Sequence, residues 1–118
     1  MLTIGTTVLG VNDVPRAVEF WTAALGYRQR EYGDDDTWAI LLPPDGKGAR
    51  LALGHSITPV QKHPRIHLDL YADDQEAEVE RLVGLGAKRV EWDLYPPDAD
   101  FVVLADPDGN RFCVIDAG

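Results

Sequence analysis

The feature that most constrains the fold is a residue pattern that occurs twice in the same order. The stretch WAILLPPDGKGARLALG at residues 38–54 is echoed by FVVLADPDGNRFCVI at residues 101–115. The two Pro-Asp-Gly elements begin at Pro44 and Pro107, 63 residues apart, and a Leu-Gly pair recurs at an offset of 60. An ordered repeat of this length predicts two structural units of the same kind.

Each copy opens with a β-rich segment, residues 6–11 in the first and 65–71 in the second, and each segment is expected to form a strand. Three further strands are expected after the helix that follows, with the last two forming a hairpin closed by the Pro-Asp-Gly turn. Asp106 and Asn110 flank the second turn, and we expect them to bond to the turn backbone, which fixes the hairpin register.

The helices are expected from apolar spacing and from capping residues. Apolar residues recur at helical spacing over residues 14–25, with Asn12 or Asp13 as the cap. The second helix is expected to begin after Asp73, since Glu76 follows at the capping-box distance. The sequence therefore predicts an α+β fold of two tandem βαβββ modules.

The predicted domain organisation is one domain over residues 1–118. It contains a first module at 3–54, a linker at 55–63 and a second module at 64–117. The length suffices for a real hydrophobic core.

Charge and cysteine content limit the classes of partner. The net charge of −9 argues against nucleic acid and against anionic membrane surfaces. The single cysteine, Cys113, excludes an internal disulfide, and the chain opens at a Met without a secretory signal pattern, so a cytoplasmic location is expected.

The acidic run Asp34–Asp36 is read as a solvated loop, because it lacks the spaced ligands of a calcium loop.

Three stretches carry a resemblance to a known superfamily: VNDVPRAVEFWTAALGY, RIHLDLYADDQEAEVERLVGLGAKRV and VVLADPDGNRFCVI. Together with the tandem βαβββ pattern, they resemble the vicinal oxygen chelate superfamily, which holds glyoxalases, extradiol dioxygenases, fosfomycin-resistance enzymes and bleomycin-binding proteins. The last two stretches look most like its glyoxalase-like domain branch. The resemblance implies a curved, cup-like mixed sheet around a ligand, with the helices outside, and it implies that homodimers are common.

The resemblance also implies four positions for metal ligands. In metal-dependent members, the first and last strands of each module each supply one ligand to a divalent ion. The matching residues here are Thr6, Ala52, His67 and Cys113. Ala52 has no donor atom and a Thr hydroxyl is a poor one, whereas His67 is a conventional ligand and a Cys113 thiolate would suit softer metals. No tightly bound metal and no other cofactor is therefore expected, and His67 would hold a metal if one were present.

His67, Asp69 and Cys113 each have several interpretations. His67 is a candidate catalytic base or lone metal ligand, or else a strand histidine bonded to a neighbour. Asp69 lies two residues further on the same strand face, where it would orient His67, serve as a carboxylate in the cavity or form a surface ion pair. Cys113 is a candidate ligand-binding residue or an inert buried thiol, because no neighbouring cation in the sequence would lower its pKa.

Thr6 and four aromatic residues complete the candidate ligand-binding set. Trp38 and Phe101 occupy equivalent repeat positions and would pack in the core or on the floor of the cup. Trp92 and Tyr95 lie in the irregular stretch EWDLYPPDAD, where they would either stack on a flat ligand or pack as a lid on their own module.

Three functions remain open at this stage. The first is a small-molecule-binding protein or metal-free enzyme that holds its ligand near His67, for example by sequestering an aromatic or antibiotic-like compound. The second is a divalent-metal-dependent lyase or dioxygenase that recruits Asp69 or Glu91 beside His67. The third, a non-catalytic partner or regulatory module, has neither a basic patch nor an amphipathic membrane helix in its favour.

Overall fold

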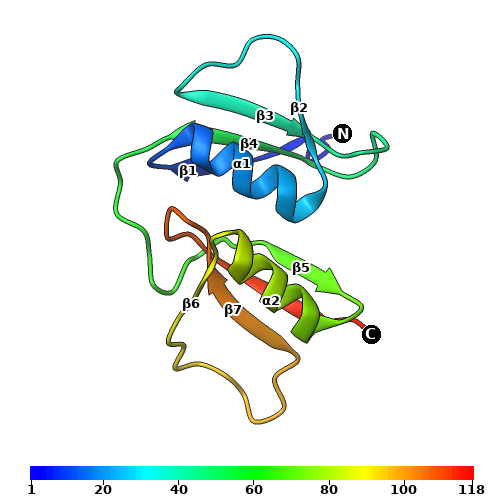
Figure 1. Ribbon diagram of the computed structural model, residues 1–118, viewed down its shortest axis with the longest axis vertical. Coiled ribbons are helices and arrows are strands. Elements are labelled where there is room, and N and C mark those ends of the chain that lie inside the picture. Colours follow the sequence, from blue (N-terminus) through cyan, green and yellow to red (C-terminus); the bar gives the residue numbers. More distant parts are fainter. The chain divides into compact units, whose positions relative to one another are not determined.

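The two copies of the repeat fold into two units in a computed structural model that describes residues 1–118 (Figure 1). The units comprise residues 1–59 and 60–118, and each has one βαβββ module. The predicted α+β fold of two tandem modules is confirmed, and each module forms a four-stranded sheet of its own. The cup that both modules together would form stays a prediction.

The first unit has a mixed sheet in the order β1-β4-β3-β2. The strands β1 and β4 pair in parallel, and the helix α1 lies in the connection that follows β1. The strands β4, β3 and β2 pair antiparallel with their neighbours. The elements of this unit are β1 (Thr6–Val11), α1 (Val14–Leu25), β2 (Arg28–Gln29), β3 (Trp38–Leu42) and β4 (Arg50–His55).

The helix α1 begins and ends where its sequence predicts. The Asp13 carboxylate accepts a hydrogen bond from the Arg16 N–H at 3.1 Å, so Asp13 rather than Asn12 is the cap. The helix stops before Gly26, whose φ of 68° lies in the left-handed region. The apolar stripe of α1 packs on the sheet face that carries Leu41 and Leu51, which are both buried.

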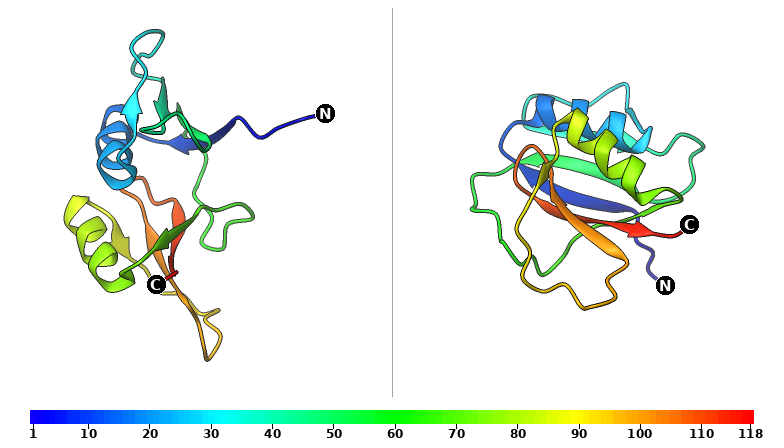
Figure 2. Two further views of the ribbon diagram at one scale, coloured as in Figure 1. Left: turned by 90° about the vertical axis from the view of Figure 1, so that its right-hand side faces the viewer. Right: turned by 60° about the horizontal axis from the view of Figure 1, so that its bottom comes forward.

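The second unit repeats this arrangement with the strand order β5-β8-β7-β6. The helix α2 lies along one face of this sheet (Figure 2, left). On that face Phe112 and Val114 of β8 are buried, as are Val79 and Leu82 of the helix. The elements are β5 (Asp69–Ala72), α2 (Gln75–Leu85), β6 (Lys88–Arg89), β7 (Phe101–Ala105) and β8 (Arg111–Asp116).

The turn between β7 and β8 has the structural role that its sequence predicts. Asp106 is 1% exposed, and its Oδ1 accepts hydrogen bonds from the backbone N–H groups of Asp108 at 3.0 Å and Asn110 at 2.8 Å. Gly109 supplies the positive φ of 93° that the turn requires. The turn therefore sets the register that places Cys113 opposite Val103.

Two sequence-based expectations about the second unit are wrong. The cap of α2 is Asp74, whose Oδ1 accepts from the Ala77 N–H at 3.1 Å, and not Asp73. The chain needs two residues to turn from the strand into the helix, so Glu76 falls one position too early for a capping box with Asp74. The strand expected over residues 65–71 begins only at Asp69, and His67 therefore precedes β5.

Neither helix has both the length and the apolar character that crossing a membrane requires.

Candidate functional site

The sheet of the second unit carries a pocket on the face opposite α2, and we call it the sheet pocket. Its volume is about 450 Å³, and it is lined by residues from β5, β7, β8, the segment before β5 and the loop between β6 and β7. The lining residues are His67, Asp69, Tyr71, Trp92, Leu94, Asp100, Phe101, Cys113 and Ile115.

The strand register explains why these residues share one face. Asp69 lies opposite Cys113 in the parallel pair β5–β8, and Tyr71 lies opposite Ile115. Phe101 of β7 also lies opposite Ile115. Since side chains alternate between the two faces of a strand, these residues point to one side of the sheet while their sequence neighbours point toward α2.

The polar part of the pocket is a cluster of His67, Asp69 and Cys113. The Nε2 atom of His67 lies 2.9 Å from Oδ1 of Asp69, so Asp69 orients the imidazole as one of the sequence-based interpretations proposed. Both side chains are partly open to solvent, at 41% and 46%, and such an exposed pair adds little to the stability of the fold. The pair therefore contributes little to holding the module together.

Cys113 is the buried member of the cluster. Its pKa rises from 9.0 to about 11, first because burial disfavours the thiolate, and then because the thiol lies beside the Asp69 carboxylate and bonds to it. At pH 7 only about one thiol in ten thousand would be ionised. The expectation of an unreactive buried thiol agrees with this environment.

The register also identifies the equivalent positions of the first unit. Cys113 and Ala52 are each the third residue of the last strand, and their partners on the first strand are Asp69 and Val8. The first module thus carries an apolar pair where the second carries a carboxylate and a thiol. The assignment of Ala52 as the counterpart of Cys113 fits this register.

Thr6 and Trp38 belong to the first unit. Thr6 is the exposed first residue of β1. The Trp38 ring lies over Gly54, where a Cβ atom would come within 3.2 Å of it. A role of either residue in binding a ligand stays a prediction.

The loop after β6 contributes Trp92 and Leu94 to the pocket wall, while Tyr95 has a supporting position. The Tyr95 hydroxyl accepts a hydrogen bond from the Val103 N–H at 2.8 Å. This bond gives the N–H a partner at a position of β7 that lies beyond the end of β6. Its ring contacts Phe101 with 5.2 Å between centroids, so Tyr95 holds a lining residue without lining the sheet pocket itself.

Four lining residues were not singled out from the sequence. Tyr71 and Ile115 follow Asp69 and Cys113 by two residues, so strand alternation alone was a signal for both. Leu94 and Asp100 lie in irregular backbone, where no periodicity indicates a direction.

A metal would fit the cluster only after rearrangement. A histidine nitrogen, a carboxylate oxygen and a sulfur are all donors that zinc accepts, and the three donor atoms lie within 4.8 Å of one another. Tetrahedral zinc would bring its ligands to roughly 3.5 Å apart. The ion would also displace the proton shared by His67 and Asp69 and the proton of the Cys113 thiol.

Comparisons with known proteins agree with the fold. The family model of the glyoxalase-like domain matches residues 6–115. The chain is similar to a possible glyoxalase from Bacillus cereus, with a TM-score of 0.70 and 20% identity over 98% of this chain and 99% of that one. It is also similar to a glyoxalase/bleomycin resistance protein/dioxygenase family enzyme from Burkholderia phytofirmans PsJN, with a TM-score of 0.73 and 15% identity over 99% of this chain and 100% of that one.

A third similar structure is a member of the glyoxalase/bleomycin resistance protein/dioxygenase superfamily from Sphaerobacter thermophilus. Its TM-score is 0.69, with 19% identity over 98% of each chain. The comparison with curated proteins gives no match. The resemblance of the sequence to the vicinal oxygen chelate superfamily is thereby confirmed.

Proposed function

This chain belongs to the glyoxalase-like domain family, and from that premise we propose that it binds a small molecule in the sheet pocket, beside His67, without a tightly held metal. The ligand would combine a flat apolar part with a polar group. This proposal keeps the ligand close to the second module's polar cluster, and it leaves the contribution of Thr6 and Trp38 to be tested.

The observation that carries the proposal is one hydrogen-bonded pair, His67 and Asp69, set in a wall that is otherwise largely apolar. Phe101, Ile115 and Leu94 supply that apolar wall. Small-molecule sites typically have about 300–1,000 Å³ and combine apolar surface with a few polar groups that fix the ligand's orientation. The sheet pocket, at about 450 Å³, has this composition.

The His67–Asp69 pair determines what the imidazole would offer a ligand. A carboxylate only accepts hydrogen bonds, so the neutral ring donates from Nε2 to Asp69 and retains its acceptor on Nδ1. Nδ1 would then accept a hydroxyl or N–H of the ligand, or take up a proton if the protein catalyses a reaction. Cys113 remains a thiol in this scheme and contributes shape rather than a nucleophile.

The test uses the His67→Ala variant and a matched control. Aromatic compounds with polar substituents are screened against the purified protein by ligand-observed NMR, and the affinity of each hit is measured for the variants. We expect His67→Ala to weaken binding at least about fivefold, the loss of one good hydrogen bond, with little change in stability. His55→Ala, at the exposed end of β4, should bind like the wild type. Equal affinities in all three proteins would refute the proposal.

The second candidate function is that of a divalent-metal-dependent lyase or dioxygenase, and the cluster of His67, Asp69 and Cys113 favours it. These side chains would hold the ion, which would act as a Lewis acid toward an oxygen of the substrate. Elemental analysis of protein purified without chelator and then dialysed separates the two candidates. Near-stoichiometric zinc, manganese, nickel or iron would favour the second, and a trace content would favour the first.

We also infer that the chain forms a homodimer, works in the cytoplasm and has neither nucleic acid nor a membrane as partner. The inference about partners rests on the net charge of −9, and the cytoplasmic location on the single cysteine. Light scattering after size-exclusion chromatography would test the dimer, and a monomer mass at micromolar concentration would contradict it.

A further inference from the structure

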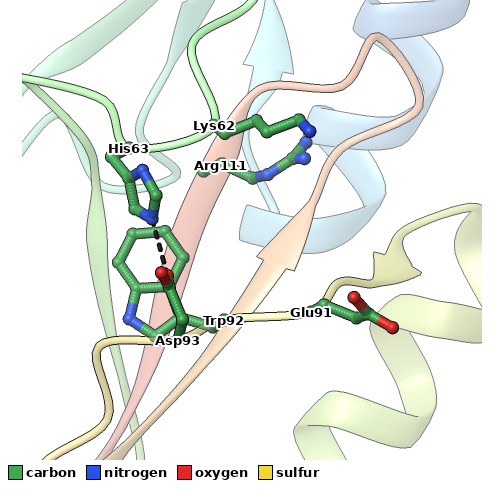
Figure 3. Close-up of a pocket in the computed structure, with 6 residues that line it drawn as sticks. All are labelled: Lys62, His63, Glu91, Trp92, Asp93 and Arg111. Carbon is green, nitrogen blue, oxygen red and sulfur yellow. Dashed lines mark hydrogen bonds and ion pairs between the residues drawn. The ribbon is translucent and has the colours of Figure 1, made fainter.

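A second hollow in the same unit shares Trp92 with the sheet pocket but none of its polar residues, and we call it the loop pocket (Figure 3). Its volume is about 690 Å³, and it is lined by Lys62, His63, Glu91, Trp92, Asp93 and Arg111. We propose that the loop pocket binds a small aromatic anion, with the anionic group held by Lys62 and Arg111 and the ring placed against Trp92. This inference does not depend on the ligand of the sheet pocket.

The two acidic side chains of the loop pocket form no ion pair with its two cations. Asp93 accepts a hydrogen bond from Nε2 of His63 at 2.7 Å, and this bond holds the pKa of Asp93 below its usual range. Asp93 is thus hydrogen-bonded to His63 and to neither cation. The Glu91 side chain points away from the His63–Asp93 pair in Figure 3.

Lys62 and Arg111 are available to an anion. Their side chains extend in the same direction in Figure 3, and neither forms an ion pair with a carboxylate. Nη1 of Arg111 donates to the backbone oxygen of Gly109 at 2.7 Å, which fixes the guanidinium and leaves its other N–H groups for a ligand. A fixed guanidinium beside an ammonium is well suited to a carboxylate or a phosphate.

Trp92 is the reason to expect a ring on the anion. Its indole is held by a tilted contact with the His63 ring, with 5.0 Å between centroids, and His63 is in turn held by Asp93. An orientation fixed in this way gives the pocket a rigid apolar wall beside its cations. A bare inorganic ion would use the cations alone and would leave this wall uncovered.

The test observes Trp92 directly in the full-length protein. The chain has three tryptophans, so its ¹H–¹⁵N spectrum has three indole signals, and Trp92→Phe identifies the relevant one. Phenyl phosphate, benzoate and phenol are titrated separately. We expect phenyl phosphate or benzoate to shift the Trp92 signal saturably, and the tighter of the two identifies the anionic group. If phenol binds as tightly as both anions, the proposal is wrong.

Two glutamine variants locate the binding charge. Lys62→Gln should weaken the better anion about tenfold, since a charge-assisted hydrogen bond is lost. Lys62 is exposed and makes no side-chain hydrogen bond, so the variant should fold normally. Lys88→Gln changes the charge equally on β6, outside the pocket, and should weaken binding less than about twofold.

Equal losses in the two variants would overturn the inference, because they would indicate nonspecific attraction. His67→Ala distinguishes this inference from the proposed function. Because Trp92 lines both pockets, the shift of its signal by the anion should persist in this variant, and a shift lost with His67 would place the anion in the sheet pocket and overturn the inference.

Discussion

Replacing Asp69 by asparagine should lower the pKa of the Cys113 thiol. Three causes raise this pKa from 9.0 to about 11: burial, the negative charge of Asp69 and the hydrogen bond to Asp69, in decreasing order. Asp69→Asn removes the charge and weakens the bond while it keeps the size and shape of the side chain. The perturbation therefore acts on two of the three causes and leaves burial in place.

The order of the causes limits the size of the effect. Burial is the largest of three contributions, so it accounts for at least a third of the rise, and Asp69 accounts for at most two-thirds. The pKa in Asp69→Asn should therefore fall by at most about 1.3 and remain above 9.0. Because the thiolate is the reactive form, the alkylation rate well below the pKa should rise by at most about twentyfold.

The assay is the rate of Cys113 alkylation by iodoacetamide at a pH near 8.5, with folding checked by circular dichroism. Asp98→Asn is the control, since Asp98 is an exposed residue of the same unit that does not line the sheet pocket. Its rate should equal that of the wild type. An unchanged or slower rate in Asp69→Asn would refute the placement of the carboxylate beside the thiol.

Three stability predictions follow from the same contacts. Because the pKa of Cys113 is raised in the folded state, the wild type should lose stability between pH 9 and about 11 relative to Cys113→Ala. The loss should be at most about 3 kcal/mol, and less where water reaches the thiol. Denaturant titrations of both proteins at the two pH values measure this loss, and an equal change in the two proteins would contradict the prediction. Asp106→Ala should cost about 3 kcal/mol in urea unfolding, since two backbone N–H groups lose a buried acceptor, whereas Asp45→Ala at the exposed first hairpin should cost under about 1 kcal/mol; similar costs would contradict the assigned role. Asp74→Ala should cost about 1 kcal/mol in thermal unfolding and Asp73→Ala close to none, and the reverse order would place the cap at Asp73.

The modules were predictable from the sequence because their signals are local. Residues 6–11 and 14–25 carry strand and helix patterns within single segments, and the structure gives a strand and a helix with those bounds. Because the pattern repeats, the same order of strands and helix was expected in the second module. The repeat also led to the equivalence of Ala52 and Cys113 through the alignment of Leu51 with Phe112, and these two residues are each the second residue of the last strand of their module.

The sites were only partly predictable because they combine distant segments with irregular backbone. The spacing of two residues led to the correct placement of Asp69 beside His67, although His67 lies before the strand, but no local signal shows that the Tyr95 hydroxyl accepts a hydrogen bond from the Val103 N–H. The loop pocket combines Lys62 with Arg111, which lie 49 positions apart in the chain, so neither local sequence predicts that the two side chains lie in one pocket. Such contacts depend on the path of the loop in three dimensions.

The proposed metal-free binding is tested most directly by one comparison of affinities. The tightest aromatic compound found for the sheet pocket is titrated into the protein before and after exhaustive treatment with EDTA. The two dissociation constants should agree within about twofold, because the proposed contact of the His67–Asp69 pair with the ligand requires no ion. Loss of binding after EDTA, with recovery on adding a divalent metal, would contradict the proposal.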